Sequence, residues 1–131
     1  MTGRSASAVD RAMRARVLIV EDEPLIAENL RLLLVESGFE VVGMSAKVDP
    51  ALRLIEEGAC DVAIVDANLA GVSAAPIATA LAARELPFIV LSGYTRAQLD
   101  VQFAGASYIQ KPYRFEQLLE NLNVVLLKPP L

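Results

Sequence analysis

The chain has 131 residues, 54% of them hydrophobic and 21% charged, which is the size and composition of one globular domain. It contains no histidine and one cysteine, Cys60, which excludes histidine-based metal sites, Ser/His and Cys/His nucleophile pairs and internal disulfides. The net charge of -4 argues against a nucleic-acid partner, and no apolar stretch approaches the roughly 20 residues that span a bilayer. We therefore expect a cytoplasmic protein that contacts neither nucleic acid nor membrane, with Cys60 as a small buried hydrophobe.

Residues 1–15 carry small, polar and basic side chains with little periodicity, and they predict a mobile N-terminal arm. We favour a disordered arm over a DNA or membrane contact, because this composition supports no packed core. One folded domain is expected over residues 16–128, followed by a short tail over 129–131. The basic cluster near the start of the chain consists of Arg4, Arg11, Arg14 and Arg16.

Five short apolar runs predict five strands of a parallel sheet. Each run is continuous rather than alternating, which is typical of strands buried on both faces. The last run is the least apolar and suits the edge of the sheet. The runs cover residues 17–20, 41–44, 62–65, 88–91 and 107–110.

Between and after the runs, apolar residues at helical spacing predict five helices. In the second helix we expect Asp49 as the N-cap, Pro50 at the first position and Gly58 at the end. The helical pattern is weakest in the fourth segment. Alternating strands and helices predict an α/β fold, a doubly wound (βα)5 sandwich with helices on both faces of the sheet. The helical segments are 24–36, 49–58, 75–84, 95–103 and 114–127.

Polar residues gather directly after the apolar runs. Glu21 and Asp22 follow the first run, Asp66 the third, Ser92 the fourth and Lys111 the fifth. Ligands of open parallel sheets bind outside the carboxyl ends of the strands, where the strand order reverses. If the order is 2-1-3-4-5, the three acids converge in one crevice, flanked by the hydroxyl and the ammonium group.

Such a crevice needs a cation. Two unit charges 4 Å apart repel by about 4 kcal/mol at an effective dielectric constant of 20, so three carboxylates stay ionised together only beside positive charge. An all-oxygen site without a rigid cage suits Mg²⁺, which keeps several waters and bridges to phosphate. Lys111 adds a second positive charge, and Asp66 beside both is suited to accept a phosphoryl group.

Four motifs in this order resemble the response-regulator receiver domain of two-component signalling. They stand at residues 17–23, 61–66, 90–93 and 108–112, and the resemblance extends from residue 17 to about 127. The resemblance implies a flavodoxin-like fold with the strand order 2-1-3-4-5.

The resemblance also implies roles at the site. Asp66 would be the phosphoacceptor, and the donor must be the phosphohistidine of a sensor histidine kinase or a histidine phosphotransfer protein, because this chain has no histidine. Glu21 and Asp22, together with Asp66 and the backbone carbonyl of Asn68, would hold Mg²⁺. Lys111 would pair with the phosphoryl group, and its bond to the following proline is expected to be cis.

Roles at four positions in the switch and in phosphate lifetime follow from the same resemblance. The hydroxyl of Ser92 would move to the phosphoryl group, and Tyr108 would be the aromatic switch that turns inward with it. Asn68 and Tyr94, each two residues after a site position, would tune the lifetime of the phosphate.

Part of the sequence resembles a subgroup of mostly stand-alone receivers with a Phe-Ala-Thr-Gly-Tyr-like fourth strand. The match lies in residues 66–71 and in Leu91-Ser92-Gly93-Tyr94, where Leu-Ser replaces Ala-Thr. Many receivers have Met-Pro shortly after the acceptor, whereas this chain has Leu69-Ala70. The region after strand four is often altered in the subgroup, in agreement with the weak helical pattern of residues 95–103.

The sequence therefore predicts a single-domain response regulator that is a monomer or weak dimer and catalyses only its own phosphorylation and dephosphorylation. With no output domain expected after residue 127, the signal would pass by contact with a downstream regulatory protein, in a phosphorelay or in kinase feedback. The alternatives are a docking module that works without phosphate and a haloacid-dehalogenase-type phosphatase, whose Asp-x-Asp motif would fall at Glu21 and Glu23. Each site residue taken singly also has a structural interpretation, as a helix cap, a turn residue or half-buried packing.

Overall fold

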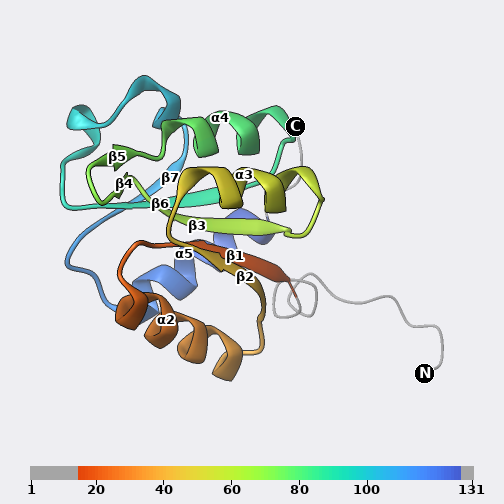
Figure 1. Ribbon diagram of the computed structural model, residues 1–131. Coiled ribbons are helices and arrows are strands. Elements are labelled where there is room, and N and C mark those ends of the chain that lie inside the picture. Colours follow the sequence, from red (N-terminus) through yellow and green to blue (C-terminus); the bar gives the residue numbers. More distant parts are fainter. Residues whose placement is uncertain (1–14, 128–131) are drawn as a thin grey trace.

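Five parallel strands form the central sheet of the computed structural model, which describes residues 15–127 (Figure 1). The order is β2-β1-β3-β6-β7, which is the predicted 2-1-3-4-5 order of an α/β doubly wound fold. The predicted arm, apart from Ala15, and the predicted tail lie outside the described residues. The strands are β1 (Arg16–Val20), β2 (Glu40–Ser45), β3 (Val62–Asp66), β6 (Phe88–Ser92) and β7 (Ser107–Gln110).

The register of the central strands decides which residues meet at the carboxyl edge. Val20 of β1 pairs with Val65 of β3, so Glu21 and Asp66 both follow one residue later at the same edge. Asp66 in turn pairs with Leu91 of β6, next to the end of that strand. All five residues of β3 are buried, as expected for the central strand of a parallel sheet.

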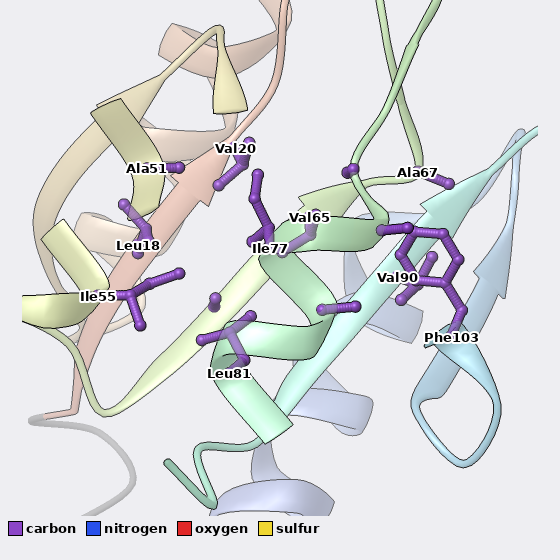
Figure 2. Packing of buried hydrophobic residues seen from close by; sticks show 14 of the residues in the cluster. Leu18, Val20, Ala51, Ile55, Val65, Ala67, Ile77, Leu81, Val90 and Phe103 are labelled. Atoms are coloured by element: carbon purple, nitrogen blue, oxygen red, sulfur yellow. The ribbon is translucent and has the colours of Figure 1, made fainter. Parts of the chain in front are cut away.

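Four α-helices cover the two faces of the sheet (Figure 1). On one face, Ile55 and Ile77 of the helices pack with Leu18 and Val90 of the strands (Figure 2). On the other face, the buried side chains of the remaining two helices pack on β1, β3, β6 and β7. The helices are α2 (Pro24–Glu36), α3 (Val48–Glu56), α4 (Ala75–Ala83) and α5 (Phe115–Leu127), with α3 and α4 on the first face.

The predicted start of the second helix is wrong. Helix α3 begins at Val48 with Lys47 at the N-cap, so Asp49 and Pro50 lie inside the first turn. The proline is tolerated there because the first N–H groups of a helix have no intrahelical acceptor, and the carboxylate complements the helix dipole. The end near Gly58 is confirmed, since α3 stops at Glu56 and Gly58 has a φ of 69°.

The predicted fourth helix over 95–103 is also wrong. The segment forms two 3₁₀ turns, η1 (Arg96–Gln98) and η2 (Val101–Phe103), separated by an extended backbone at Leu99 and Asp100. Phe103 is the only residue of the two turns that is buried. Phe103 lies in the core and Leu99 packs against it, so these two apolar side chains anchor the short turns to the domain.

A small hairpin that the sequence did not predict follows Asp66. Strands β4 (Asn68–Leu69) and β5 (Val72–Ser73) are antiparallel and joined by Ala70 and Gly71, whose φ angles are 53° and 89°. Two consecutive left-handed residues are the mark of a tight hairpin turn. The Asn68 side-chain oxygen accepts the Gly71 N–H at 2.8 Å and closes the turn.

Two further properties of the described residues concern the helices and Cys60. None of the helices between residues 15 and 127 has the length and apolar character required to cross a membrane. Cys60 is buried in the core, and its burial raises the pKa of the thiol, which confirms it as a packing residue rather than a reactive one.

Candidate functional site

Three acidic side chains converge at the carboxyl edge of the sheet, as the strand order predicts. Glu21, Asp22 and Asp66 each offer one carboxylate oxygen, and these oxygens all lie within 4.8 Å of one another. Glu21 and Asp66 are only 5% and 6% exposed, whereas Asp22 is partly exposed. The parallel register of β1 and β3 brings the acids together, because both strands end at this edge.

Lys111 provides the opposing positive charge from the loop after β7. Its Nζ lies 2.6 Å from Oδ2 of Asp66 and 3.8 Å from Oε1 of Glu21. Its backbone N–H donates to the carbonyl of Ser92 at 2.7 Å, which ties the loop to the end of β6. The Lys111–Pro112 bond is cis, as the family resemblance implied.

The second oxygen of Asp66 is held by the hairpin that follows it. The N–H of Asn68 donates to Oδ1 of Asp66 at 3.2 Å. The side chain of Asn68 is exposed and bonds the hairpin turn instead of the acids. The expected use of its backbone carbonyl as a metal ligand therefore stays a prediction, as does a role of this side chain in phosphate lifetime.

Ser92 and Tyr108 are connected through the backbone of Tyr94. The Oγ of Ser92, the buried last residue of β6, accepts the N–H of Tyr94 at 3.0 Å. The hydroxyl of Tyr108, a half-buried residue of β7, donates to the carbonyl of the same Tyr94. Both residues of the predicted switch pair thus contact Tyr94, which is also one of the two positions predicted to tune the lifetime of the phosphate.

Sequence reasoning missed Arg96, which stands in η1. Its guanidinium carbon lies 5.2 Å from the centre of the Tyr108 ring, and its Nη2 donates to the carbonyl of Ala106 at 2.8 Å. No local signal in the sequence marks this arginine, because its position depends on the 3₁₀ turn that replaces the predicted helix.

The charges of the site shift the pKa values of its members. Burial, with the nearby charge of Asp66, raises the pKa of Glu21 to about 7, although the Glu23 N–H and the charge of Lys111 oppose the shift. Burial lowers the pKa of Lys111, but the hydrogen bond and charge of Asp66 and the charge of Glu21 together outweigh burial and raise it. The cluster holds more negative charge than one ammonium group neutralises.

This donor set fits a hard divalent cation. All three side chains offer carboxylate oxygens, which Mg²⁺ prefers, and Asp22 leaves the cluster open to solvent on one side. A hollow of about 560 Å³ opens beside Asp22, between the loop before α3 and the β4–β5 hairpin. Of the three acids, Asp22 is the one that lines this hollow.

Comparison with known proteins agrees with this geometry. The family model of the response regulator receiver domain matches residues 17–123. The transcriptional regulatory protein PdtaR of Mycobacterium tuberculosis is 32% identical over 130 residues, which are 96% of this chain and 63% of that protein. The transcriptional regulatory protein MalR of Bacillus subtilis is 30% identical over 113 residues, which are 82% of this chain and 48% of that protein. The chain thus spans about half to two thirds of the length of these relatives.

Two solved structures extend the comparison to the fold. SdrG from Sphingomonas melonis Fr1 is 38% identical, with a TM-score of 0.74, over 88% of this chain and 98% of that one. TrrA from Thermotoga maritima, in a complex with Mg²⁺ and BeF, is 28% identical, with a TM-score of 0.73, over 84% of this chain and 97% of that one. The match of the family model to most of the chain, on the same fold, shows that the chain belongs to the response regulator receiver domain family.

Proposed function

We propose that the chain accepts a phosphoryl group on Asp66 from the phosphohistidine of a sensor histidine kinase or a histidine phosphotransfer protein, in a reaction that requires Mg²⁺. The observation that carries the proposal is the pairing of Asp66 with Lys111 at 2.6 Å beside two further carboxylates. If Asp66 were only a turn residue, it would need neither the ammonium group of Lys111 nor the neighbouring carboxylates. TrrA, with its bound Mg²⁺ and BeF, shows that a member of the family binds these ligands.

In the proposed step, a side-chain oxygen of Asp66 attacks phosphorus, and the P–N bond to the donor imidazole breaks. The electron pair of that bond stays on the imidazole nitrogen, and an aspartyl phosphate forms. Glu21, Asp22, Asp66 and the carbonyl of Asn68 would hold Mg²⁺, which supplies neutralising charge for the phosphoryl oxygens. Lys111 pairs with the phosphoryl group, and the Ser92 hydroxyl donates to one of its oxygens.

The output belongs to the same proposal. Phosphorylation would shift the population of conformations at Ser92 and Tyr108 and so change a surface that a downstream regulatory protein contacts. The chain would turn over no separate substrate. A cytoplasmic location is also part of the proposal, in agreement with a single buried cysteine and no disulfide.

Phosphorylation by a small donor tests the assignment of Asp66. Purified protein is incubated with acetyl phosphate, with Mg²⁺ or with a chelator, and phosphate incorporation is followed by intact mass. We expect incorporation only with Mg²⁺, and none in Asp66→Asn. Asp61→Asn is the matched control, because Asp61 lies one residue before the opposite end of the same strand and should leave incorporation intact. Incorporation into Asp66→Asn at the wild-type rate would refute the assignment.

Partner binding tests the alternative of a phosphate-independent docking module. Once a binding protein is identified, its affinity for wild type and for Asp66→Asn is compared with and without phosphorylation. The proposal predicts that phosphorylation changes the affinity of the wild type only. Equal affinity in all four samples would favour the docking module.

A further inference from the structure

A continuous series of contacts leads from the buried Ser92 hydroxyl to an exposed arginine. The Tyr94 N–H donates to Oγ of Ser92, and the Tyr94 carbonyl accepts the Tyr108 hydroxyl. The ring of Tyr108 lies beneath the guanidinium of Arg96, 5.2 Å from ring centre to guanidinium carbon. These contacts therefore connect the site to the 3₁₀ segment that contains η1 and η2.

Arg96 is held in place independently of the tyrosine. Its Nη2 donates to the carbonyl of Ala106, next to the start of β7, at 2.8 Å. The 3₁₀ turn that carries Arg96 is capped at its start by a hydrogen bond between Thr95 and Gln98. The side-chain oxygen of Gln98 accepts the Thr95 N–H at 2.8 Å. The guanidinium thus bridges η1 and β7 above the aromatic ring.

We propose that Arg96 is a positioning residue of the phosphorylation switch. It holds the Tyr108 side chain in place, so that the Tyr108 hydroxyl stays hydrogen-bonded to the carbonyl of Tyr94. The inference rests on the proposed function of Asp66 and Ser92 and adds a residue to it. With Tyr108 held, the Tyr94 backbone is fixed, and its N–H occupies a lone pair of the Ser92 oxygen. The hydroxyl proton of Ser92 then stays available for an anionic oxygen at Asp66.

Loss of the arginine is expected to loosen this arrangement and to weaken binding of a phosphoryl analogue. A cation above a partly exposed aromatic ring such as that of Tyr108 contributes an amount that corresponds to about a two- to five-fold change in an equilibrium constant. Arg96→Ala should therefore raise the dissociation constant of beryllofluoride with Mg²⁺ by that factor. Arg96→Lys keeps a cation near the ring but lacks the planar fork, and it should recover part of the loss.

Two readouts on the full chain separate the inference from the proposed function. The first is the ring NMR signals of the three tyrosines without ligand, each assigned by a Tyr→Phe variant. The second is titration with beryllofluoride at saturating Mg²⁺. Arg114→Ala is the matched control, because the Arg114 side chain is 88% exposed and forms its ion pair with Glu116.

We expect Arg96→Ala to move the Tyr108 ring signals and to weaken beryllofluoride binding, with no effect of Arg114→Ala. In a Tyr108→Leu background, Arg96→Ala should have no further effect on affinity. Unchanged Tyr108 signals in Arg96→Ala, or shifted signals with unchanged affinity, would overturn the inference while leaving the proposed function intact. Absence of beryllofluoride binding in the wild type would instead refute the proposed function, and the ligand-free spectra would still decide whether Arg96 positions Tyr108.

Discussion

Lys111 and Asp66 are 45 residues apart in the chain, yet their side chains meet at 2.6 Å. The contact forms because β3 and β7 flank β6 and all three end at the same edge of the sheet. The Lys111 side chain is 33% exposed and that of Asp66 is nearly buried, so the pair lies at the boundary between core and solvent. The single ammonium group of Lys111 thus faces three carboxyl groups, so the negative charge among these four side chains exceeds the positive charge.

Replacing Lys111 with methionine tests the role of this cation. We expect Lys111→Met to fold, because the methionine fills the volume of the lysine stem, and to lose beryllofluoride binding by at least about ten-fold, since a charge-assisted hydrogen bond contributes about 1.5–3 kcal/mol. Isothermal titration at saturating Mg²⁺ measures the loss. Lys111→Arg should recover little, because the planar guanidinium does not reproduce a point charge. Wild-type affinity in Lys111→Met would contradict the proposed pairing.

Replacing Asp22 with asparagine should have opposite effects on stability and on metal binding. In a chelator, Asp22→Asn removes repulsion among three carboxylates that lie within 4.8 Å of one another, and it should raise the free energy of unfolding by about 1 kcal/mol. The same change removes a proposed Mg²⁺ ligand and should abolish the expected stabilisation of the wild type by Mg²⁺. Urea unfolding with and without Mg²⁺ measures both effects. A loss of stability in the chelator would mean that the acids are not in repulsion.

The hydrogen bond between Ser73 and Asp100 connects the hairpin after Asp66 to the 3₁₀ segment. The Ser73 hydroxyl donates to Oδ2 of Asp100 at 2.7 Å and accepts the Ala75 N–H at 3.1 Å. Ser73→Ala should cost about 0.5–1.5 kcal/mol and speed amide hydrogen exchange in η2. Unchanged exchange over residues 101–103 would show that the bond does not restrain the segment.

The ion pair of Arg16 and Asp61 predicts a pH dependence of stability. The Asp61 carboxylate accepts the backbone N–H and both Nε and Nη2 of Arg16 at 2.9–3.2 Å, and hydrogen bonding to the Arg16 side chain lowers its pKa from the ordinary value of 3.8. A pKa lowered by folding adds stability above the unfolded pKa, and that stability is lost as the pH falls through the folded pKa.

A comparison of the unfolding free energies of wild type and Asp61→Asn measures the contribution of the Asp61 carboxylate to stability. We expect wild type to be the more stable protein at pH 6 and the difference to shrink steadily below about pH 4. Because both side chains are more than two fifths exposed, the difference should be small and should also decrease in high salt. A difference that is constant from pH 6 to pH 2 would exclude the carboxylate charge as its cause.

Local patterns in the sequence were enough to predict the sheet and the residues at its carboxyl edge. Glu21, Asp66 and Ser92 each directly follow a continuous apolar run, and such a run is a local pattern. Each polar residue therefore marks the end of a buried strand. The convergence of the acids then followed from one rule of parallel sheets, and the structure agrees with it.

Features that depend on burial across the sheet could be seen only in the folded domain. The start of α3 two residues before the expected position and the 3₁₀ turns around Arg96 reflect what each segment can bury, which local propensity does not record. The contact of Arg96 with Tyr108 and the 2.6 Å pair of Lys111 and Asp66 join residues on different elements. Such distances are set by the packing of the whole domain, because each partner is placed by its own strand or turn rather than by its neighbours in the chain.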